Sequence, residues 1–353
     1  MKRKVIVLTG GGTAGHVLPC LALLPYLKSV FSEIHFIGSN SGYEKKLVGN
    51  AAEYHGIDAV KLARGNLFKA IPVPFKLWKA KRQAAALLKE ISPDAIFSKG
   101  GYVALPVVLA SKGIPVYLHE SDLTMGLANR LSLKKCTKIF TSFDTYDLDK
   151  AVCTGSPIRR SIYDGNAEAA RRECGFVSNK PVLLVMGGSS GAKAVNECIY
   201  SCLDRLLKTF DIVHITGEKF PSEIKRVGYR PIGYTDRIED YLALCDYAVS
   251  RGGSGALFEL MALKIPTLII PLPKGASRGD QVDNAEYFSS RGAALVLPQN
   301  EMDAETLPLA IERLMSGKAA LKDGMDKLGK ADGTREIAKT IIAECAERQG
   351  EKI

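Results

Sequence analysis

The chain has 353 residues, of which 46% are hydrophobic and 24% charged, and its net charge is +10. This composition is that of a globular protein long enough for two domains, and it excludes a disordered or low-complexity chain. Eight scattered cysteines without a Cys/His cluster exclude a zinc knuckle and predict a reducing compartment. Because no apolar run approaches the roughly 18 residues of a membrane span, and the first run is too short for a signal peptide, we expect neither.

The first motif lies in residues 5–19, which read VIVLTGGGTAGHVLP. Its apolar start predicts a buried strand, its glycines a loop and its end a helix. Gly10, Gly12 and Gly15 have the G-x-G-x-x-G spacing that brings backbone N–H groups close to a phosphate. The next predicted strand, 34–38, ends without the acidic residue that binds the ribose of a dinucleotide, which argues against an NAD-dependent enzyme.

His16 directly follows this loop, in the first turn of the predicted helix. A helix N-terminus disfavours the imidazolium, so a histidine there tends to be neutral and able to accept a proton. His16 is therefore a candidate general base. The alternative is a helix-start residue that hydrogen-bonds a loop carbonyl.

Residues 59–89 contain eight Lys or Arg and no acid, with large apolar side chains between them. Basic and apolar residues together suit the surface of an anionic membrane better than a nucleic acid. An amphipathic core helix with a solvated basic face is the alternative. The predicted membrane-contacting residues are Phe68, Phe75, Lys76, Leu77, Trp78 and Lys79.

Strands and helices alternate through the first half of the chain, with further strands predicted at 95–98 and 116–118. This alternation predicts a parallel sheet covered on both faces. Ligands bind beyond the carboxyl ends of such strands, so we expect the loops 10–16, 99–102 and 119–122 to converge there.

The same plan begins again after a Gly/Pro-marked linker, with strand, glycine loop and helix signals from residue 181 onward. We therefore predict an α/β protein of two doubly wound domains that face each other across a cleft. The expected N-terminal domain is 1–155 and the C-terminal domain is 156–333. A final helix in 334–353 is expected to pack back toward the N-terminal domain.

A second glycine cluster, 252–255, lies between a predicted strand and a predicted helix. Arg251 and the loop N–H groups offer positive charge to a diphosphate, and Glu259, one turn further on, can accept both hydroxyls of a ribose. The amides of Gln281 and Asn284 could bind sugar hydroxyls. Alternatively, Glu259 only interacts favourably with the helix dipole, and Gln281 and Asn284 only belong to the start of a surface helix.

Asp147 and Asp149 have the D-x-D spacing of metal-dependent sugar-nucleotide enzymes, but they lie in a charged stretch without a predicted strand end. We therefore predict no metal and no cofactor. Helix N-termini and arginines would then stabilise a leaving diphosphate.

The chain resembles the MurG-type family in motifs that occur in order: GGGTAGH, SKGGYVALP, HESD-x4-GLAN, GSPIR, MGGSSGA with Asn196, SRGGSGALFE and DQ-x2-NA. These enzymes are peptidoglycan N-acetylglucosaminyltransferases that convert lipid I to lipid II. The resemblance implies a GT-B fold and an inverting, metal-independent transfer of GlcNAc from UDP-GlcNAc. The acceptor would be C4-OH of the MurNAc-pentapeptide on undecaprenyl diphosphate, at the cytoplasmic membrane face. Implied partners are UDP-GlcNAc, lipid I, the anionic membrane surface and other cell-wall synthesis proteins, but no nucleic acid.

The resemblance also implies roles for individual residues. His16 is our hypothesis for the base, with Glu120 as second choice. Donor-binding residues would be Thr13, Ala14, Gly15, Arg159, Ser189, Thr235, Ser254, Gly255, Ala256, Leu257, Phe258, Glu259, Gln281 and Asn284. Acceptor-binding residues would be Gly12, Tyr102, His119 and Asn129. Asp122 stands where many members have asparagine, and an acid cannot donate as an amide does.

Two other functional classes share some of these features. A UDP-GlcNAc 2-epimerase has the same two-domain fold and donor but no use for a basic-aromatic membrane segment. A non-catalytic sugar-nucleotide or lipid-binding scaffold would need neither His16 nor Glu259. The sequence therefore favours the transferase.

Overall fold

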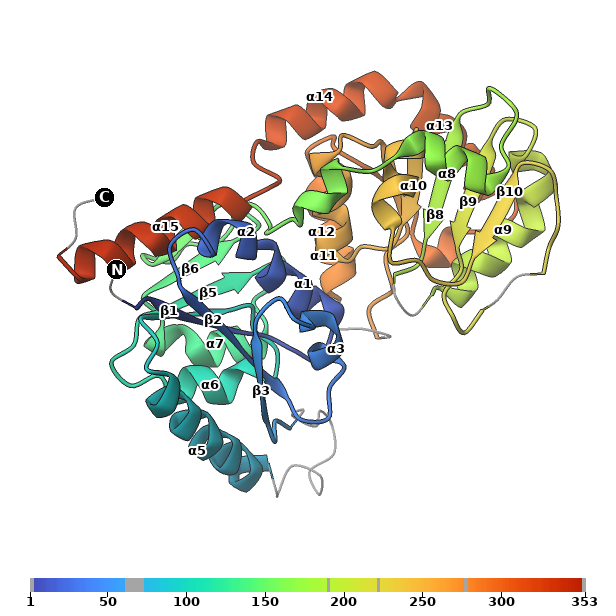
Figure 1. Cartoon of the computed structure of the whole chain (residues 1–353). Coiled ribbons are helices and arrows are strands. Elements are labelled where there is room, and N and C mark those ends of the chain that lie inside the picture. Colours follow the sequence, from blue (N-terminus) through green and yellow to red (C-terminus); the bar gives the residue numbers. More distant parts are fainter. Residues whose placement is uncertain (1–2, 61–72, 189–190, 221–222, 276–278, 351–353) are drawn as a thin grey trace. The chain divides into compact units, whose positions relative to one another are not determined.

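The computed structural model describes residues 3–60, 73–188, 191–220, 223–275 and 279–350 (Figure 1). The chain divides into two compact units. Unit 1 consists of Met1–Arg159 and Asp332–Ile353, and unit 2 of Arg160–Ala331. Each unit contains its own parallel sheet, so the predicted two doubly wound α/β domains are confirmed.

Unit 1 is built on a seven-stranded sheet in the order β3-β2-β1-β4-β5-β6-β7, with every pairing parallel. Central strands such as β1 are buried along their whole length because helices cover both faces of the sheet. The strands are β1 (Val5–Thr9), β2 (Glu33–Ser39), β3 (Glu53–Ile57), β4 (Ala95–Ser98), β5 (Val116–Glu120), β6 (Lys138–Thr141) and β7 (Ala151–Cys153).

Two apolar cores flank this sheet. One core joins the face that carries Ile6 and Phe36 to α1, α2, α3 and α15, and the other joins the face that carries Val7 and Ile37 to α5 and α6. The final helix, α15, therefore packs within unit 1. The helices of unit 1 are α1 (Ala14–Ala22), α2 (Leu24–Leu27), α3 (Glu44–Val48), α5 (Val73–Ile91), α6 (Ala104–Ala110), α7 (Leu127–Ser132), η1 (Leu133–Lys135) and α15 (Thr334–Arg348).

Unit 2 repeats the architecture with a six-stranded parallel sheet in the order β10-β9-β8-β11-β12-β13. Its strands are β8 (Val182–Met186), β9 (Asp211–Ile215), β10 (Tyr229–Ile232), β11 (Tyr247–Ser250), β12 (Thr267–Ile269) and β13 (Leu295–Val296). Its helices are η2 (Arg160–Tyr163), α8 (Ala167–Cys174), α9 (Lys193–Leu206), α10 (Ile238–Leu244), α11 (Ser254–Ala262), α12 (Asp280–Ser290), η3 (Gln299–Glu301), α13 (Thr306–Ser316) and α14 (Lys318–Leu328).

The direction of strand addition reverses beside the first strand of each sheet. In unit 1 the reversal lies between β1 and β4, and in unit 2 between β8 and β11. Doubly wound folds bind ligands at the carboxyl ends of the strands at this point. The glycine loops of both units follow these strands, so the topology places them where ligands are expected.

Across the described ranges, none of the helices is both long enough and apolar enough to span a bilayer.

Candidate functional site

The first glycine loop is shaped by close packing. A Cβ atom on Gly10 would lie 2.3 Å from the carbonyl oxygen of His16, and one on Gly12 would lie 2.6 Å from the ring of Tyr102. Gly12 also has a φ of +87°, a conformation that side chains disfavour. Gly10 and Gly12 are therefore required by the packing of the loop itself, independently of any phosphate.

A buried carboxylate from α3 holds this loop. Glu44 has no exposed surface, and its Oε1 accepts a hydrogen bond of 2.7 Å from the backbone N–H of Gly12. This N–H is engaged within the protein, and contact between Gly12 and the acceptor stays a prediction. Sequence reasoning missed Glu44 because it lies 32 residues away, outside any recognised motif.

His16 is the third residue of α1 and is half-buried. Its Nδ1 lies 2.9 Å from the carbonyl oxygen of Gly11 and 3.0 Å from Oγ1 of Thr13. Because a carbonyl oxygen can only accept, Nδ1 carries the hydrogen. In the neutral ring the lone pair then resides on Nε2, so this geometry selects the tautomer that a general base requires.

The three loops expected at the carboxyl edge do converge. A Cβ on Gly101 would lie 3.1 Å from Nδ1 of His16, which shows that the loop after β4 touches the loop after β1. The Nζ of Lys99 donates a hydrogen bond of 2.8 Å to Oγ of Ser121, which joins the loops after β4 and β5. The predicted convergence within unit 1 is therefore confirmed.

Lys99 is a second residue whose role the sequence did not reveal. It is almost fully buried, and burial lowers its pKa, while the charges of Glu120 and Asp122 act in the opposite direction. A Cβ on Gly10 would lie 3.3 Å from Cβ of Lys99, so this buried side chain packs against the loop that precedes His16.

Glu120 ends β5 and accepts four hydrogen bonds. Its Oε1 accepts from the N–H groups of Ser121 (3.0 Å) and Asp122 (3.1 Å). Its Oε2 accepts from the N–H of Gly126 (2.9 Å) and from Nδ2 of Asn129 (3.0 Å). Both oxygens are thus occupied in ordering the following loop, which argues against Glu120 as the base.

His119 and Asn129 lie behind the loops. His119 has no exposed surface, its Nε2 lies 3.2 Å from the carbonyl oxygen of Gly155, and burial lowers its pKa well below the usual value. Asn129 is buried and its Nδ2 also donates to the carbonyl oxygen of His119. Both side chains hold the loops from behind, and their contact with the acceptor stays a prediction. Tyr102, the other predicted acceptor residue, is half-buried.

In unit 2, α11 begins directly at the second glycine cluster. Ser254, Gly255 and Ala256 form its first turn, where backbone N–H groups have no partner within the helix. Leu257 and Phe258 are buried, and the ring of Phe258 packs edge-to-face on Phe288 at 5.4 Å. The side chains of Leu257 and Phe258 therefore belong to the core, and a donor contact of this helix turn through its backbone stays a prediction.

The predicted sugar-binding amides support the glycine cluster. Asn284 has no exposed surface, and its Nδ2 donates a hydrogen bond of 3.1 Å to the carbonyl oxygen of Gly252. The Oε1 of Gln281 accepts from the N–H of Leu272 at 3.0 Å. Asn284 thus holds the glycine cluster in place, and its contact with the sugar stays a prediction. Gln281 and Glu259 are half-buried.

Four further predicted donor residues are Arg159, Ser189, Thr235 and Arg251. Arg251 donates a hydrogen bond of 3.0 Å from Nη1 to the carbonyl oxygen of Ile270, and burial lowers its pKa. Oγ1 of Thr235 accepts from the N–H of Arg237 at 3.0 Å. Arg159 is the last residue of the first segment of unit 1. Ser189 lies outside the described residues.

Helix α5 carries the predicted membrane residues. Phe75 is 68% exposed and Trp78 is 51% exposed, and their rings stack at 5.8 Å. Arg82 lies over the Trp78 ring at 4.8 Å, while Lys79 pairs with Asp58 at 3.1 Å. Phe68 lies outside the described residues.

Comparison with known proteins identifies the family. Residues 6–141 match the glycosyltransferase family 28 N-terminal domain, and residues 182–341 match its C-terminal domain. A protein of Geobacillus thermodenitrificans is 44% identical over 350 residues, which cover 96% of this chain and 98% of that protein. The chain belongs to glycosyltransferase family 28. This confirms the resemblance to the MurG-type enzymes.

Two relatives of this family 28 chain carry the same name. The Geobacillus protein and a Lachnospira eligens protein, 43% identical over 96% of this chain and 98% of its own length, are both called UDP-N-acetylglucosamine--N-acetylmuramyl-(pentapeptide) pyrophosphoryl-undecaprenol N-acetylglucosamine transferase. Among solved structures, Acinetobacter baumannii MurG matches with a TM-score of 0.74 at 24% identity, over 96% of this chain and 99% of that one. A UDP-N-acetylglucosamine 2-epimerase matches with a TM-score of 0.67 at 14% identity, over 99% and 97%. These two structures share the fold.

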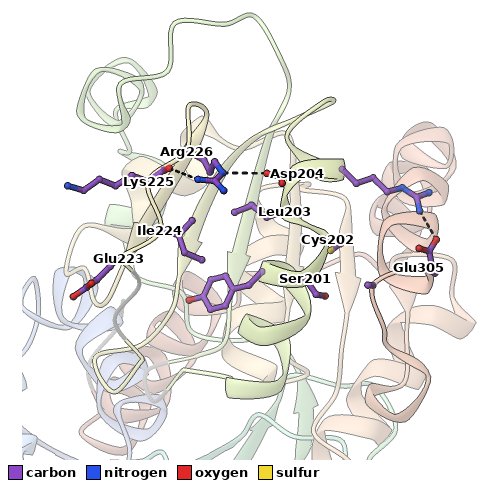
Figure 2. A pocket seen from close by; sticks show the side chains of 12 residues that line it. Ser201, Cys202, Leu203, Asp204, Glu223, Ile224, Lys225, Arg226 and Glu305 are labelled. Carbon is purple, nitrogen blue, oxygen red and sulfur yellow. Dashed lines mark hydrogen bonds and ion pairs between the residues drawn. The ribbon is translucent and has the colours of Figure 1, made fainter.

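A cavity of about 570 Å³ in the family 28 C-terminal domain is separate from the predicted site (Figure 2). It lies between α9 and the segment around Arg226, whose Nε is 3.5 Å from Asp204 Oδ1. None of the predicted site residues lines it. Its lining residues are Tyr200, Ser201, Cys202, Leu203, Asp204, Arg205, Glu223, Ile224, Lys225, Arg226, Ala304 and Glu305.

Proposed function

We propose that this chain transfers GlcNAc from UDP-GlcNAc to C4-OH of the MurNAc-pentapeptide of lipid I, forming lipid II. The observation that carries this proposal is the 44% identity, over 96% of the chain, to a relative named for this transfer. The 2-epimerase shares only the fold, at 14% identity, and no residue of the site specifically favours it.

In this proposal, unit 1 binds the acceptor and supplies the base. Nε2 of His16 takes the proton from C4-OH as that oxygen attacks C1 of GlcNAc, and the bond from C1 to UDP breaks with its electron pair leaving on the diphosphate. Attack from the face opposite UDP inverts the configuration at C1. The hydrogen bond from Nδ1 to the carbonyl of Gly11 holds the required tautomer, and a positioned base of this kind contributes about 10²–10⁴-fold to the rate.

Unit 2 would bind the donor. The first-turn N–H groups of α11 and the positive end of its dipole suit the diphosphate, and Glu259 suits the ribose. Arg159 and Ser189 would add to the diphosphate site, Thr235 to the uracil site and Gln281 to the GlcNAc site. Because these groups would neutralise the leaving UDP, we expect the reaction to proceed without a divalent cation.

The acceptor is a lipid, so the enzyme must meet a membrane. We propose that α5 docks on the anionic cytoplasmic surface through Phe75 and Trp78, with the basic side chains of the segment beside them. The exposure of two stacked aromatic rings on a helix that carries Lys76, Lys81 and Arg82 supports this role.

Release of UDP from UDP-GlcNAc, measured in excess chelator with and without a short-chain lipid I analogue, tests this proposal. We expect release only when the acceptor is present. Release without acceptor would indicate an epimerase or a hydrolase, and no release in either case would indicate a binding scaffold.

A further inference from the structure

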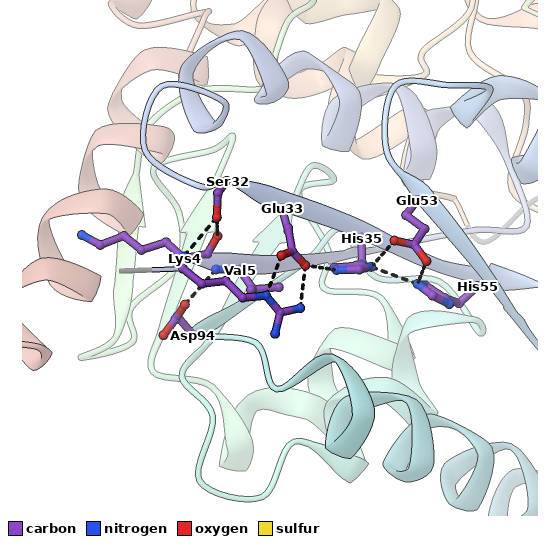
Figure 3. Close-up of polar contacts among 9 residues, drawn as sticks. Lys4, Val5, Ser32, Glu33, His35, Glu53, His55 and Asp94 are labelled. Atoms are coloured by element: carbon purple, nitrogen blue, oxygen red, sulfur yellow. Dashed lines mark hydrogen bonds and ion pairs between the residues drawn. The ribbon is translucent and has the colours of Figure 1, made fainter. Parts of the chain in front are cut away.

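Two of the five histidines of the chain meet on unit 1, away from the predicted site (Figure 3). His35 lies on β2, and Glu53 and His55 lie on the edge strand β3. The parallel register places His35 directly beside Glu53 and Ile37 beside His55. Because residues two apart share a sheet face, all three polar side chains project from the same face.

The potential ligand atoms are spaced as around a metal ion. Nδ1 of His35 lies 3.0 Å from Nε2 of His55 and 3.4 Å from Oε2 of Glu53. Nε2 of His55 lies 3.7 Å from the other oxygen of Glu53. Ligands about 2.1 Å from a tetrahedral Zn²⁺ are about 3.4 Å apart, so little movement would bring the three groups onto one ion.

A neighbouring carboxylate completes the arrangement. The other ring nitrogen of His35, Nε2, is buried without a hydrogen-bond partner and lies 3.5 Å from Oε2 of Glu33. Arg3 fixes Glu33 by two hydrogen bonds of 2.5 and 2.6 Å. When Nδ1 of a histidine binds a metal, Nε2 carries the hydrogen and commonly donates it to such a carboxylate. This explains an otherwise unsatisfied buried atom.

Exposure and charge also suit a cation. The His35 side chain is 7% exposed and the His55 side chain 19%, whereas Glu53 is 67% exposed, so one side of the cluster opens to solvent. Two imidazoles with a carboxylate beside them form a donor set typical of zinc sites.

We propose that His35, Glu53 and His55 bind Zn²⁺, or a similar first-row transition-metal dication, and that the ion ties the edge strand β3 to β2. Water would complete the coordination. The cluster lies toward the amino-terminal ends of these parallel strands, whereas the glycine loop follows the carboxyl end of β1. The site therefore has no part in sugar transfer, and the inference is independent of the proposed function.

Zinc binding by the full-length, untagged protein tests this proposal, measured by competition with a chromophoric chelator. We expect one Zn²⁺ per chain, at least 100-fold weaker binding in His55→Ala, and about tenfold weaker binding in Glu33→Gln. Cys153→Ser, which removes an exposed thiol, is the matched control and should bind as the parent does. Zn²⁺ should raise the melting temperature of the parent but not that of His55→Ala.

Cobalt substitution provides a second readout. Co²⁺ at this site should give the intense visible bands of a tetrahedral ion without a thiolate charge-transfer band. Zinc binding that survives His55→Ala, a thiolate band, or no binding to the folded parent protein would each overturn the proposal. In the last case the two imidazoles would form only a hydrogen-bonded pair.

Discussion

The substitution Glu120→Gln tests whether Glu120 stabilises the fold or acts as the catalytic base. The carboxylate of Glu120 accepts hydrogen bonds from Ser121, Asp122, Gly126 and Asn129. Glutamine retains one oxygen, which can satisfy two of these donors. Its NH₂ group would face the other two, and two opposing donors cannot hydrogen-bond to each other.

The expected cost follows from these contacts. A buried donor left without a partner costs about 1–3 kcal/mol, so two of them cost about 2–6 kcal/mol. The N–H groups of Ser121, Asp122 and Gly126 are only partly buried, so water can replace part of each lost hydrogen bond and lower this cost. We therefore expect Glu120→Gln to destabilise unit 1 by about 3 kcal/mol and to accelerate hydrogen exchange between residues 121 and 129.

Urea unfolding and hydrogen exchange of Glu120→Gln would be compared with those of Glu347→Gln, a change at an exposed position of α15. The control should unfold as the parent does. If Glu120→Gln retains the stability and exchange pattern of the parent but loses turnover by 10³-fold or more, our interpretation is refuted and Glu120 is the base.

Three further predictions concern other residues. His16→Ala should lower kcat about 10²–10⁴-fold at saturating substrates without changing the melting temperature, and a near-normal kcat would exclude His16 as base. Burial lowers the pKa of His214 from 6.5 to about 4. As pH falls, His214 therefore takes up a proton in the unfolded state before it does so in the folded state. The free energy of unfolding of unit 2 should fall by about 3 kcal/mol between about pH 6.5 and about pH 4. Urea unfolding across this range checks this slope, which His214→Gln should flatten; an equal slope in both proteins would contradict it. Phe75→Ser with Trp78→Ser should abolish sedimentation with anionic vesicles, whereas Leu309→Ser, at an exposed position of unit 2, should leave it intact.

The central strands of both sheets can be predicted from the sequence, but most of the edge strands cannot. Central strands such as Val5–Thr9 are buried on both faces and read as continuous apolar runs. β3, β7 and β10 lie at sheet edges and were not predicted. β3 reads EYHGI and β10 contains Pro231, so neither has the apolar pattern of a central strand. Because β3 was missed, His35 and His55 could not be brought together from the sequence.

The motifs predict where the candidate site lies, but they do not predict what each residue does there. The glycine loops, His16 and the first turn of α11 lie at the strand ends where the pattern places them. Asn129 and Asn284 belong to the same motifs yet are buried and hold neighbouring loops. A motif indicates which residue type occupies a position. Whether that side chain contacts a ligand or the protein backbone depends on the packing around it.

The most direct test of the proposed function follows the sugar itself. The purified protein would be incubated with radiolabelled UDP-GlcNAc and a short-chain lipid I analogue, and the labelled product characterised by mass spectrometry and NMR. We predict one GlcNAc joined through a β linkage to C4 of MurNAc for each UDP released. Label recovered as free sugar or as ManNAc, or an unmodified acceptor, would contradict the proposal.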